Sequence, residues 1–175
     1  MKKYFFLLLL LGFPLVSIGQ DMVDLQKKIV KAKNPVFDDE FEGGLYLATK
    51  LIMENHRLRG SKEYSAAEKI VTYWKDKEKW FTLPLESKFQ QSLQSDYVWS
   101  FINEVAQINY ILNQKYFKNR TIKCTSVKEK KEVQLEAAKM VLKYSIDNKV
   151  NLPVAAQKYV EAYNNNKLEK IFFKK

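Results

Sequence analysis

The sequence predicts an all-α protein built from stacked helical hairpins, and three observations support this. Apolar residues recur at intervals of three and four through most of the chain. Turn-forming residues are few, with five glycines and four prolines among 175 residues, whereas a β-rich domain needs many turns. Serine or aspartate precedes several periodic segments, where helix caps occur. The 46% apolar content also excludes a disordered chain, so we expect a packed core.

The amino-terminal segment has the pattern of an export signal. Two lysines precede an apolar run over residues 4–16, which fits a signal-peptide hydrophobic region and is too short to span a membrane. Small side chains follow at Ser17 and Gly19, where a signal peptidase requires them. We therefore predict a signal peptide over residues 1–19 and a single periplasmic or secreted domain over residues 20–175.

Cysteine usage fits an exported domain that is stabilised by packing alone. Cys124 is the only cysteine, so an internal disulfide is impossible. No cysteine lies near the end of the leader, which excludes a lipid anchor of the bacterial lipoprotein kind. No later stretch approaches the roughly 20 apolar residues of a transmembrane helix, so we expect a soluble product.

Periodic apolar residues divide the first part of the domain into helices with polar links. These helices are predicted over residues 21–33, 45–54, 61–78, 84–93 and 95–114. Pro35 ends the first helix, because proline disfavours a helical conformation in the residue before it. Residues 37–44 are acidic and are predicted to be a solvated loop. Ser61, or Ser65 in a capping box, begins the third helix.

The second part of the domain contains the longest predicted helix. Ser95 or Asp96 caps the helix that precedes it, and residues 115–125 lack periodicity and are predicted to be loop. Ser126 and Glu129 then form a capping box, which marks a helix start. The remaining helices are predicted over residues 126–148, 153–163 and 168–173.

Two stretches of the domain resemble each other, namely AAEKIVTYWKD at residues 66–76 and AAKMVLKYSID at residues 137–147. Each is followed by Leu-Pro, at residues 83–84 and 152–153, and then by a short helical pattern. This favours a unit of long helix, loop and short helix that is used twice. The alternative is that two unrelated buried helices share alanines and a tyrosine.

The net charge of +10 is unevenly distributed. Residues 20–114 contain 13 basic and 14 acidic residues, a balance of −1. Residues 115–175 contain 15 basic and 6 acidic residues, a balance of +9. The basic surplus of the domain therefore lies in its last third and indicates an anionic partner.

Cations and aromatic residues alternate where this basic third begins. We predict that the binding residues are Tyr116, Phe117, Lys118, Arg120 and Lys123. Aromatic side chains between cations are typical of sites for single-stranded nucleic acid or acidic polysaccharide. Export argues against nucleic acid, which leaves an envelope protein, an anionic polymer or an anionic membrane surface. A lysine-rich face that is merely solvated is the alternative.

The sequence supplies little for catalysis. His56 is the only histidine and lies in a polar turn, where a surface position is expected. A nucleophile pair of Cys124 with His56 is conceivable because basic neighbours favour a thiolate, but an oxidising compartment argues against a reactive thiol. The alternative function is a small envelope enzyme, with a pocket that joins His56 to Glu54 or Glu63.

We predict no catalytic residue, no metal ligand and no cofactor from sequence motifs. Glycine-rich phosphate loops, paired His-Glu metal motifs and the Gly-x-Ser-x-Gly elbow are absent. A single histidine cannot complete a zinc site of the usual kind. The acidic residues 38–42 are adjacent rather than alternate, unlike the ligands of a calcium loop.

Several short phrases carry a resemblance to a group of proteins. The leader ends in Gly-Gln at residues 19–20, Ser-Lys-Glu-Tyr occupies residues 61–64, and Lys-Leu-Glu-Lys occupies residues 167–170. With the Leu-Pro pairs, these phrases resemble short exported all-helical proteins of Bacteroidetes-type bacteria. The resemblance supports the all-α prediction and implies no activity and no site residues. We therefore expect an exported, non-enzymatic interaction module.

Overall fold

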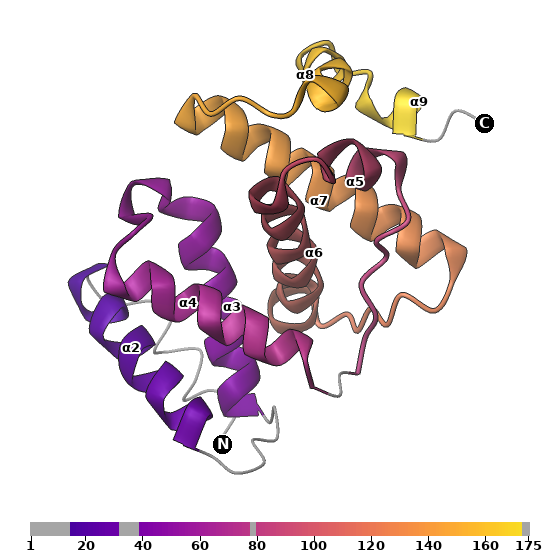
Figure 1. Cartoon of the computed structure of the whole chain (residues 1–175). Helices are drawn as coiled ribbons and strands as arrows, with labels where there is room; N and C mark the ends of the chain where they lie inside the picture. The colour runs from indigo at the N-terminus through magenta and orange to yellow at the C-terminus, as the bar shows by residue number, and fades with distance from the viewer. Residues whose placement is uncertain (1–14, 32–38, 78–79, 173–175) are drawn as a thin grey trace.

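The computed structural model describes residues 15–31, 39–77 and 80–172 (Figure 1). Every regular element among these residues is a helix, so the all-α prediction is confirmed. The elements are α2 (Leu15–Lys31), α3 (Asp39–Glu54), the 3₁₀ turn η1 (His56–Leu58), α4 (Lys62–Lys75), α5 (Lys88–Leu93), α6 (Tyr97–Lys118), α7 (Val127–Asn148), the 3₁₀ turn η2 (Val154–Ala156), α8 (Gln157–Asn164) and α9 (Leu168–Phe172).

The first three described helices pack together as one group. Met22 and Ile29 of α2 are buried against α3 and α4. The Leu25 side chain of α2 packs directly against Gly44 of α3, where an added Cβ would lie 3.2 Å from Leu25 Cγ and closer still to Cδ2. Ser61 caps α4, since its Oγ accepts a hydrogen bond from Tyr64 N at 3.1 Å. Glycine thus permits the close packing of α2 on α3.

The helix α6 lies at the centre of the molecule, between α3 and α7 (Figure 1). Asp96 caps α6 by accepting hydrogen bonds from the N–H groups of Val98 and Trp99. Much of α6 is buried, because apolar residues occupy both the face toward α3 and the face toward α7. The helix α7 returns beside α6, so the two form a hairpin whose connection spans residues 119–126 (Figure 1).

The short helices before and after this hairpin pack against it. The helix α5 packs against α6 and η2, and α8 packs against α7 and α9. Three aromatic rings join these pieces, since Tyr159 lies 5.0 Å from Phe89 and 6.1 Å from Phe172 between ring centroids. The chain from α5 to α9 is thereby drawn into one continuous apolar core with the first group.

Two segments that were predicted as loops are helical instead. The described part of the acidic segment, from Asp39 onward, forms the start of α3, where carboxylates are favoured by the helix dipole. Residues 37 and 38 lie outside the described residues. The helix α6 continues to Lys118 rather than ending at residue 114, and Asn119 then ends it in a left-handed conformation with φ 50°. In both cases a buried contact described below stabilises the extra turn.

Other predicted boundaries moved by a few residues. The helix α4 ends at Lys75, and α5 begins at Lys88 after the cap Ser87 rather than at Pro84. The helix α7 matches its predicted limits. Residues 1–14 of the predicted signal peptide lie outside the described residues, and α2 runs through the predicted cleavage point. The internal repeat stays a prediction. Its two long helices differ in length, since α4 has 14 residues and α7 has 22.

Candidate functional site at the basic end of the α6–α7 hairpin

The five predicted binding residues lie on one short stretch of chain but differ in environment. Tyr116, Phe117 and Lys118 form the last turn of α6, and Arg120 and Lys123 lie in the connection to α7. We call residues 115–128 the basic end of the hairpin. Some of these side chains bind acids within the protein, and others project into solvent.

A buried carboxylate lies beneath the last turn of α6. Glu42 of α3 is only 3% exposed. Its Oε2 accepts a hydrogen bond from Trp80 Nε1 at 2.5 Å, and its Oε1 accepts one from the Tyr116 hydroxyl at 3.1 Å. Lys115 forms an ion pair with the same carboxylate. A buried carboxylate is tolerated only when it is paired and hydrogen-bonded, and Glu42 meets both conditions.

The aromatic rings around Glu42 also contact the lysine. The Lys115 ammonium lies 4.9 Å from the centroid of the Trp80 ring and 5.6 Å from that of Tyr116, within cation–π range. Glu42, Trp80, Lys115 and Tyr116 therefore form one network, which we call the Glu42 cluster. It joins α3, α6 and the chain after α4. Tyr116 consequently holds α6 in place through contacts within the protein.

Phe117 has one packed side and one exposed side. Its ring centroid lies 5.6 Å from that of Tyr46 in α3. The side chain is nevertheless 45% exposed. Tyr46 is itself held by Asn113, whose Nδ2 donates to the Tyr46 hydroxyl at 3.3 Å. Phe117 can therefore offer an apolar edge to a partner from a fixed position.

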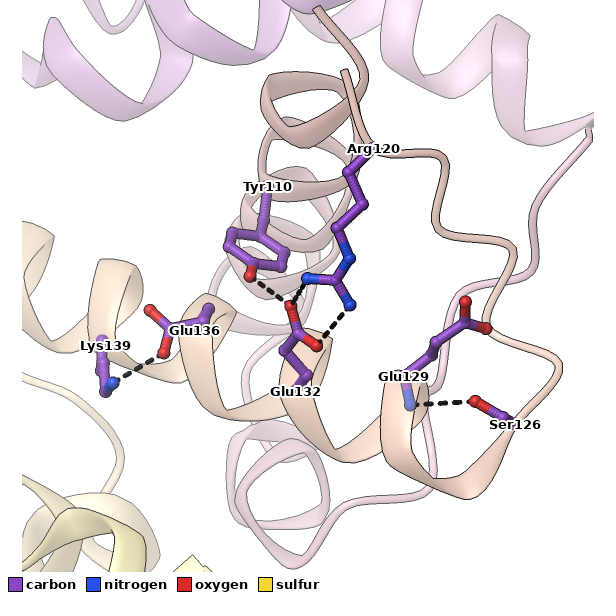
Figure 2. Close-up of polar contacts among 7 residues, drawn as sticks. All are labelled: Tyr110, Arg120, Ser126, Glu129, Glu132, Glu136 and Lys139. Carbon is purple, nitrogen blue, oxygen red and sulfur yellow. Dashed lines mark hydrogen bonds and ion pairs between the residues drawn. The ribbon is translucent and has the colours of Figure 1, made fainter. Parts of the chain in front are cut away.

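Arg120 is bound to an acid of α7 (Figure 2). Its two terminal nitrogens donate to the Glu132 carboxylate at 2.5 and 2.8 Å, and the Tyr110 hydroxyl donates to Glu132 Oε1 at 2.7 Å. The hydrogen bond from Arg120 is the main cause that lowers the pKa of Glu132. This bidentate pair fixes the connection to both helices. Arg120 thus positions the connection, and its charge is largely balanced there.

The first turn of α7 is held by the predicted capping box (Figure 2). Ser126 Oγ accepts a hydrogen bond from Glu129 N at 3.2 Å. The Glu129 carboxylate reaches back to Thr125 N at 3.2 Å, one residue before the cap. Together with Arg120 and Glu132, this box gives the connection a defined shape rather than that of a loose loop.

Three lysines of the basic end project into solvent. Lys118, Lys123 and Lys128 are exposed, and their side chains form no ion pair or hydrogen bond with any residue that the structure describes. The backbone beside them is fixed, because Ile122 is buried and Thr82 N donates to the carbonyl oxygen of Lys123 at 3.3 Å. The basic end is therefore a shaped surface with unbalanced positive charge.

Cys124 does not have the properties of a nucleophile. The side chain is buried, and burial raises the pKa of the thiol to about 11. The thiol is therefore protonated near neutral pH. The basic neighbours of Cys124 in the sequence do not reverse this effect.

His56 lies in the 3₁₀ turn η1, as the predicted turn requires, and its side chain is half-buried. Its Nδ1 lies 2.5 Å from the Tyr144 hydroxyl, and the two rings meet edge to face at 5.4 Å. Burial raises the pKa of Tyr64, and the neighbouring Tyr144 raises it further. Packing of η1 against α7 explains the burial of His56. The described contact of His56 is thus with a tyrosine, whereas the enzyme alternative needs a carboxylate such as Glu54 or Glu63.

Sequence reasoning missed Glu42, although a signal was present. Glu42 precedes Leu45 and Tyr46 by three and four residues, so all three share one face if the helix begins earlier. Treating the acidic segment as solvated concealed this spacing. A glutamate on the apolar face of a helix should have prompted a search for buried donors.

Comparisons with protein-family models, with curated proteins and with solved structures find no match to the chain. Among the described residues, no group of three or more His, Cys, Asp or Glu side chains could hold a metal ion. No helix in the described part of the chain is long and apolar enough to cross a membrane. The site is therefore characterised by its own geometry and charge.

Proposed function

We propose that this protein is an exported, non-enzymatic helical interaction module, periplasmic or secreted, that binds an anionic component of the cell envelope. The contacting residues are Phe117, Lys118 and Lys123, with Lys128 beside them. The observation that carries the proposal is the unbalanced charge of these three exposed lysines on a fixed backbone. Tyr116 and Arg120 act by holding that backbone in position.

Met22 and Ile29 of α2 are buried and follow the predicted cleavage point after Gly19. A domain cleaved at that point would therefore keep these two core residues.

The combination of an apolar edge and cations favours an acidic polymer or acidic protein segment. Phe117 supplies a ring face, and the lysines supply charges that attract carboxylate, sulfate or phosphate groups. Single-stranded nucleic acid has the same chemistry, but the proposed export removes it from the compartment. Attraction of this kind weakens with ionic strength, because the Debye length falls from about 10 Å at 0.1 M salt to about 3 Å at 1 M.

The test measures binding of the full chain to dextran sulfate and to neutral dextran across a salt series. We expect binding to dextran sulfate alone, and a steep loss of affinity as salt is added. The double variant Lys118→Gln/Lys123→Gln should bind more weakly and with a shallower salt dependence. Lys167→Gln/Lys170→Gln is the matched control, because it removes two exposed charges elsewhere.

The control separates a site from a general effect of net charge. Equal loss in the two double variants would show that only the overall charge matters, and the proposed site would be wrong. Binding that does not respond to salt, or no binding to the polyanion, would also contradict the proposal. All variants carry the same leader sequence, so its two lysines contribute equally to each measurement.

A further inference from the structure

The helix α2 contains a glutamine that becomes the first residue of the chain if the export proposed above takes place. The predicted cut after Gly19 leaves Gln20 with a free α-amino group. In a glutamine at the end of a chain, this nitrogen lies within reach of the carbon of its own side-chain amide. A reaction between two groups that are held so close needs no encounter in solution and is therefore favoured.

The charges along α2 fit a helix that begins at Gln20. The first turn of α2 as it stands in the uncut chain contains no acid. Asp21 and Asp24 lie in the turn that follows Gln20, and Lys28 and Lys31 lie in the last turn. Acids near the start of a helix and bases near its end are stabilised by the helix dipole. We therefore expect α2 of the mature chain to stay helical from Gln20 onward.

The buried residues described in α2 follow Gln20. Met22 and Ile29 are buried, whereas Asp21, directly after Gln20, is exposed. Figure 1 shows α2 at the periphery of the molecule, and its inner side packs against α3 and α4. Packing thus holds α2 from Met22 onward, and a reaction at Gln20 leaves these anchors in place.

We propose that the exported protein carries pyroglutamate at position 20, formed from Gln20 after the leader is removed. The unprotonated α-amino nitrogen attacks the side-chain amide carbon, and a lactam C–N bond forms. The bond from this carbon to the side-chain nitrogen breaks, and that nitrogen leaves as ammonia with a proton from the amine. A fraction of α-amino groups is unprotonated near neutral pH, which supplies the nucleophile. The step needs no oxidant, reductant or second substrate.

The release of ammonia, rather than charge, drives this reaction. A free amino terminus is positive at the positive end of the helix dipole, but Asp21 and Asp24 partly balance that charge. The lactam is neutral, and its ring constrains the first residue as proline does, which suits the start of a helix. A chain without a free α-amino group is also protected from aminopeptidases. The modification would therefore close the exposed start of α2 to trimming outside the cytoplasm.

The test is the intact mass of the exported protein. The full chain is expressed with its own leader in an exporting bacterial host, isolated from periplasm and medium, and kept at neutral pH until its mass is constant. We expect the mass of residues 20–175 less one molecule of ammonia. Gln20→Ala is the matched control and should keep its full mass. Edman degradation should read Ala-Asp-Met-Val from this variant and should be blocked on the wild type.

Every other result contradicts the proposal. The full mass of residues 20–175 with a readable Gln-Asp-Met-Val sequence would show that the glutamine stays open although export and cleavage occur. A different amino terminus would show that Gln20 is not the first residue, and export would still hold. The same mass deficit in Gln20→Ala would assign the loss of ammonia to another amide of the chain.

A chain that keeps its leader would overturn both this modification and the proposed export. The two proposals are otherwise independent, because binding to dextran sulfate is measured at the other end of the argument's chain of residues, at Lys118 and Lys123. Normal binding by a protein with an open Gln20 would remove the modification alone.

Discussion

The two ends of the α6–α7 hairpin both expose cations, but the buried contacts beneath these cations differ between the two ends. At the basic end the exposed lysines sit above two acids, Glu42 and Glu132, whose charges are used inside the protein. At the opposite end, near η1 and the end of α7, exposed arginines lie beside a group of aromatic rings that centres on Tyr144. Charged side chains therefore form ion pairs that stabilise the fold at the basic end, whereas at the other end they are mainly exposed to solvent.

This difference shows which cations are available to a partner. A count of basic residues treats Lys115 and Arg120 as equal to Lys118 and Lys123, yet the first two are bound to acids. The unbalanced charge is what remains after these internal pairs have formed. The following predictions test how much the buried contacts at each end contribute to the stability of the fold.

The largest expected effect is that of Glu42→Ala. The substitution leaves the Lys115 ammonium, the Trp80 indole N–H and the Tyr116 hydroxyl without their shared acceptor. Removing one partner of a buried pair costs about 3 to 5 kcal/mol, and the partial exposure of Lys115 places the expected loss near the lower value. The free energy of unfolding in urea measures it. A loss below about 1 kcal/mol would show that the Glu42 cluster contributes little to the stability of the basic end.

Glu136→Ala is the matched control for this experiment. Glu136 also pairs with a lysine, Lys139, but both side chains are partly exposed and lie three residues apart on α7 (Figure 2). Such pairs contribute about 0.2 to 0.5 kcal/mol. The comparison therefore separates the loss of a buried acceptor from the loss of one negative charge.

The next prediction concerns whether the connection at the basic end is packed or open. Because the pKa of Cys124 is about 11 rather than the ordinary 9.0, its thiolate fraction at pH 8 is about a hundredfold lower. Native protein should react with iodoacetamide at least about a hundredfold more slowly than protein in urea. The rate is followed by mass spectrometry. Rapid reaction of the native protein would show that the connection opens readily.

At the end of the hairpin opposite the basic end, Tyr144→Phe is expected to have an intermediate effect. The substitution removes the hydroxyl that contacts His56 Nδ1 at 2.5 Å, and leaves this ring nitrogen without that contact. We expect a loss of about 1 to 2 kcal/mol in the free energy of unfolding. Tyr97→Phe removes an exposed hydroxyl and should change stability by less than about 0.5 kcal/mol. Equal effects would show that the Tyr144 network does not support this end.

The contrast between the ends also explains what the sequence could predict. Periodic apolar residues and caps depend on neighbours within a few positions, so the all-α class, α7 and the capping box at Ser126 were correct. The Glu42 cluster joins residues 38 to 74 positions apart. Contacts over such sequence separations depend on how the helices pack together. A local sequence pattern does not predict that packing.

The exposure of some predicted site residues could be read from the sequence, whereas their contacts could not. The charge imbalance singled out Lys118 and Lys123, and both side chains are exposed. The binding role of this stretch stays a prediction. Tyr116 and Arg120 belong to internal networks instead, because Glu42 and Glu132 come from other helices. Part of the alternating pattern of cations and aromatic residues therefore reflects contacts within the fold. The contact between His56 and Tyr144, which lie 88 positions apart, was missed for the same reason.

The smallest expected effect separates Arg120 from Lys118, two neighbours of equal charge. Arg120→Ala breaks the bidentate pair with Glu132 and should lower the free energy of unfolding by about 1 kcal/mol at neutral pH, because the pair is partly screened by solvent. Lys118→Ala should change it by less than about 0.5 kcal/mol. Unfolding in urea at several pH values measures both. Equal losses of unfolding free energy in the two variants at neutral pH would contradict the view that Arg120 positions the connection whereas Lys118 is only exposed.

The pH dependence of this small effect identifies its cause. The pKa of Glu132 is lowered in the folded state, so its pair with Arg120 stabilises the fold above the ordinary carboxyl value of 4.5. As the pH falls below 4.5 and through the lowered value, Glu132 becomes protonated and the contribution is lost. The difference between the wild type and Arg120→Ala should therefore shrink below pH 4.5. A difference that persists at low pH would assign the effect to the packing of the arginine chain rather than to its charge.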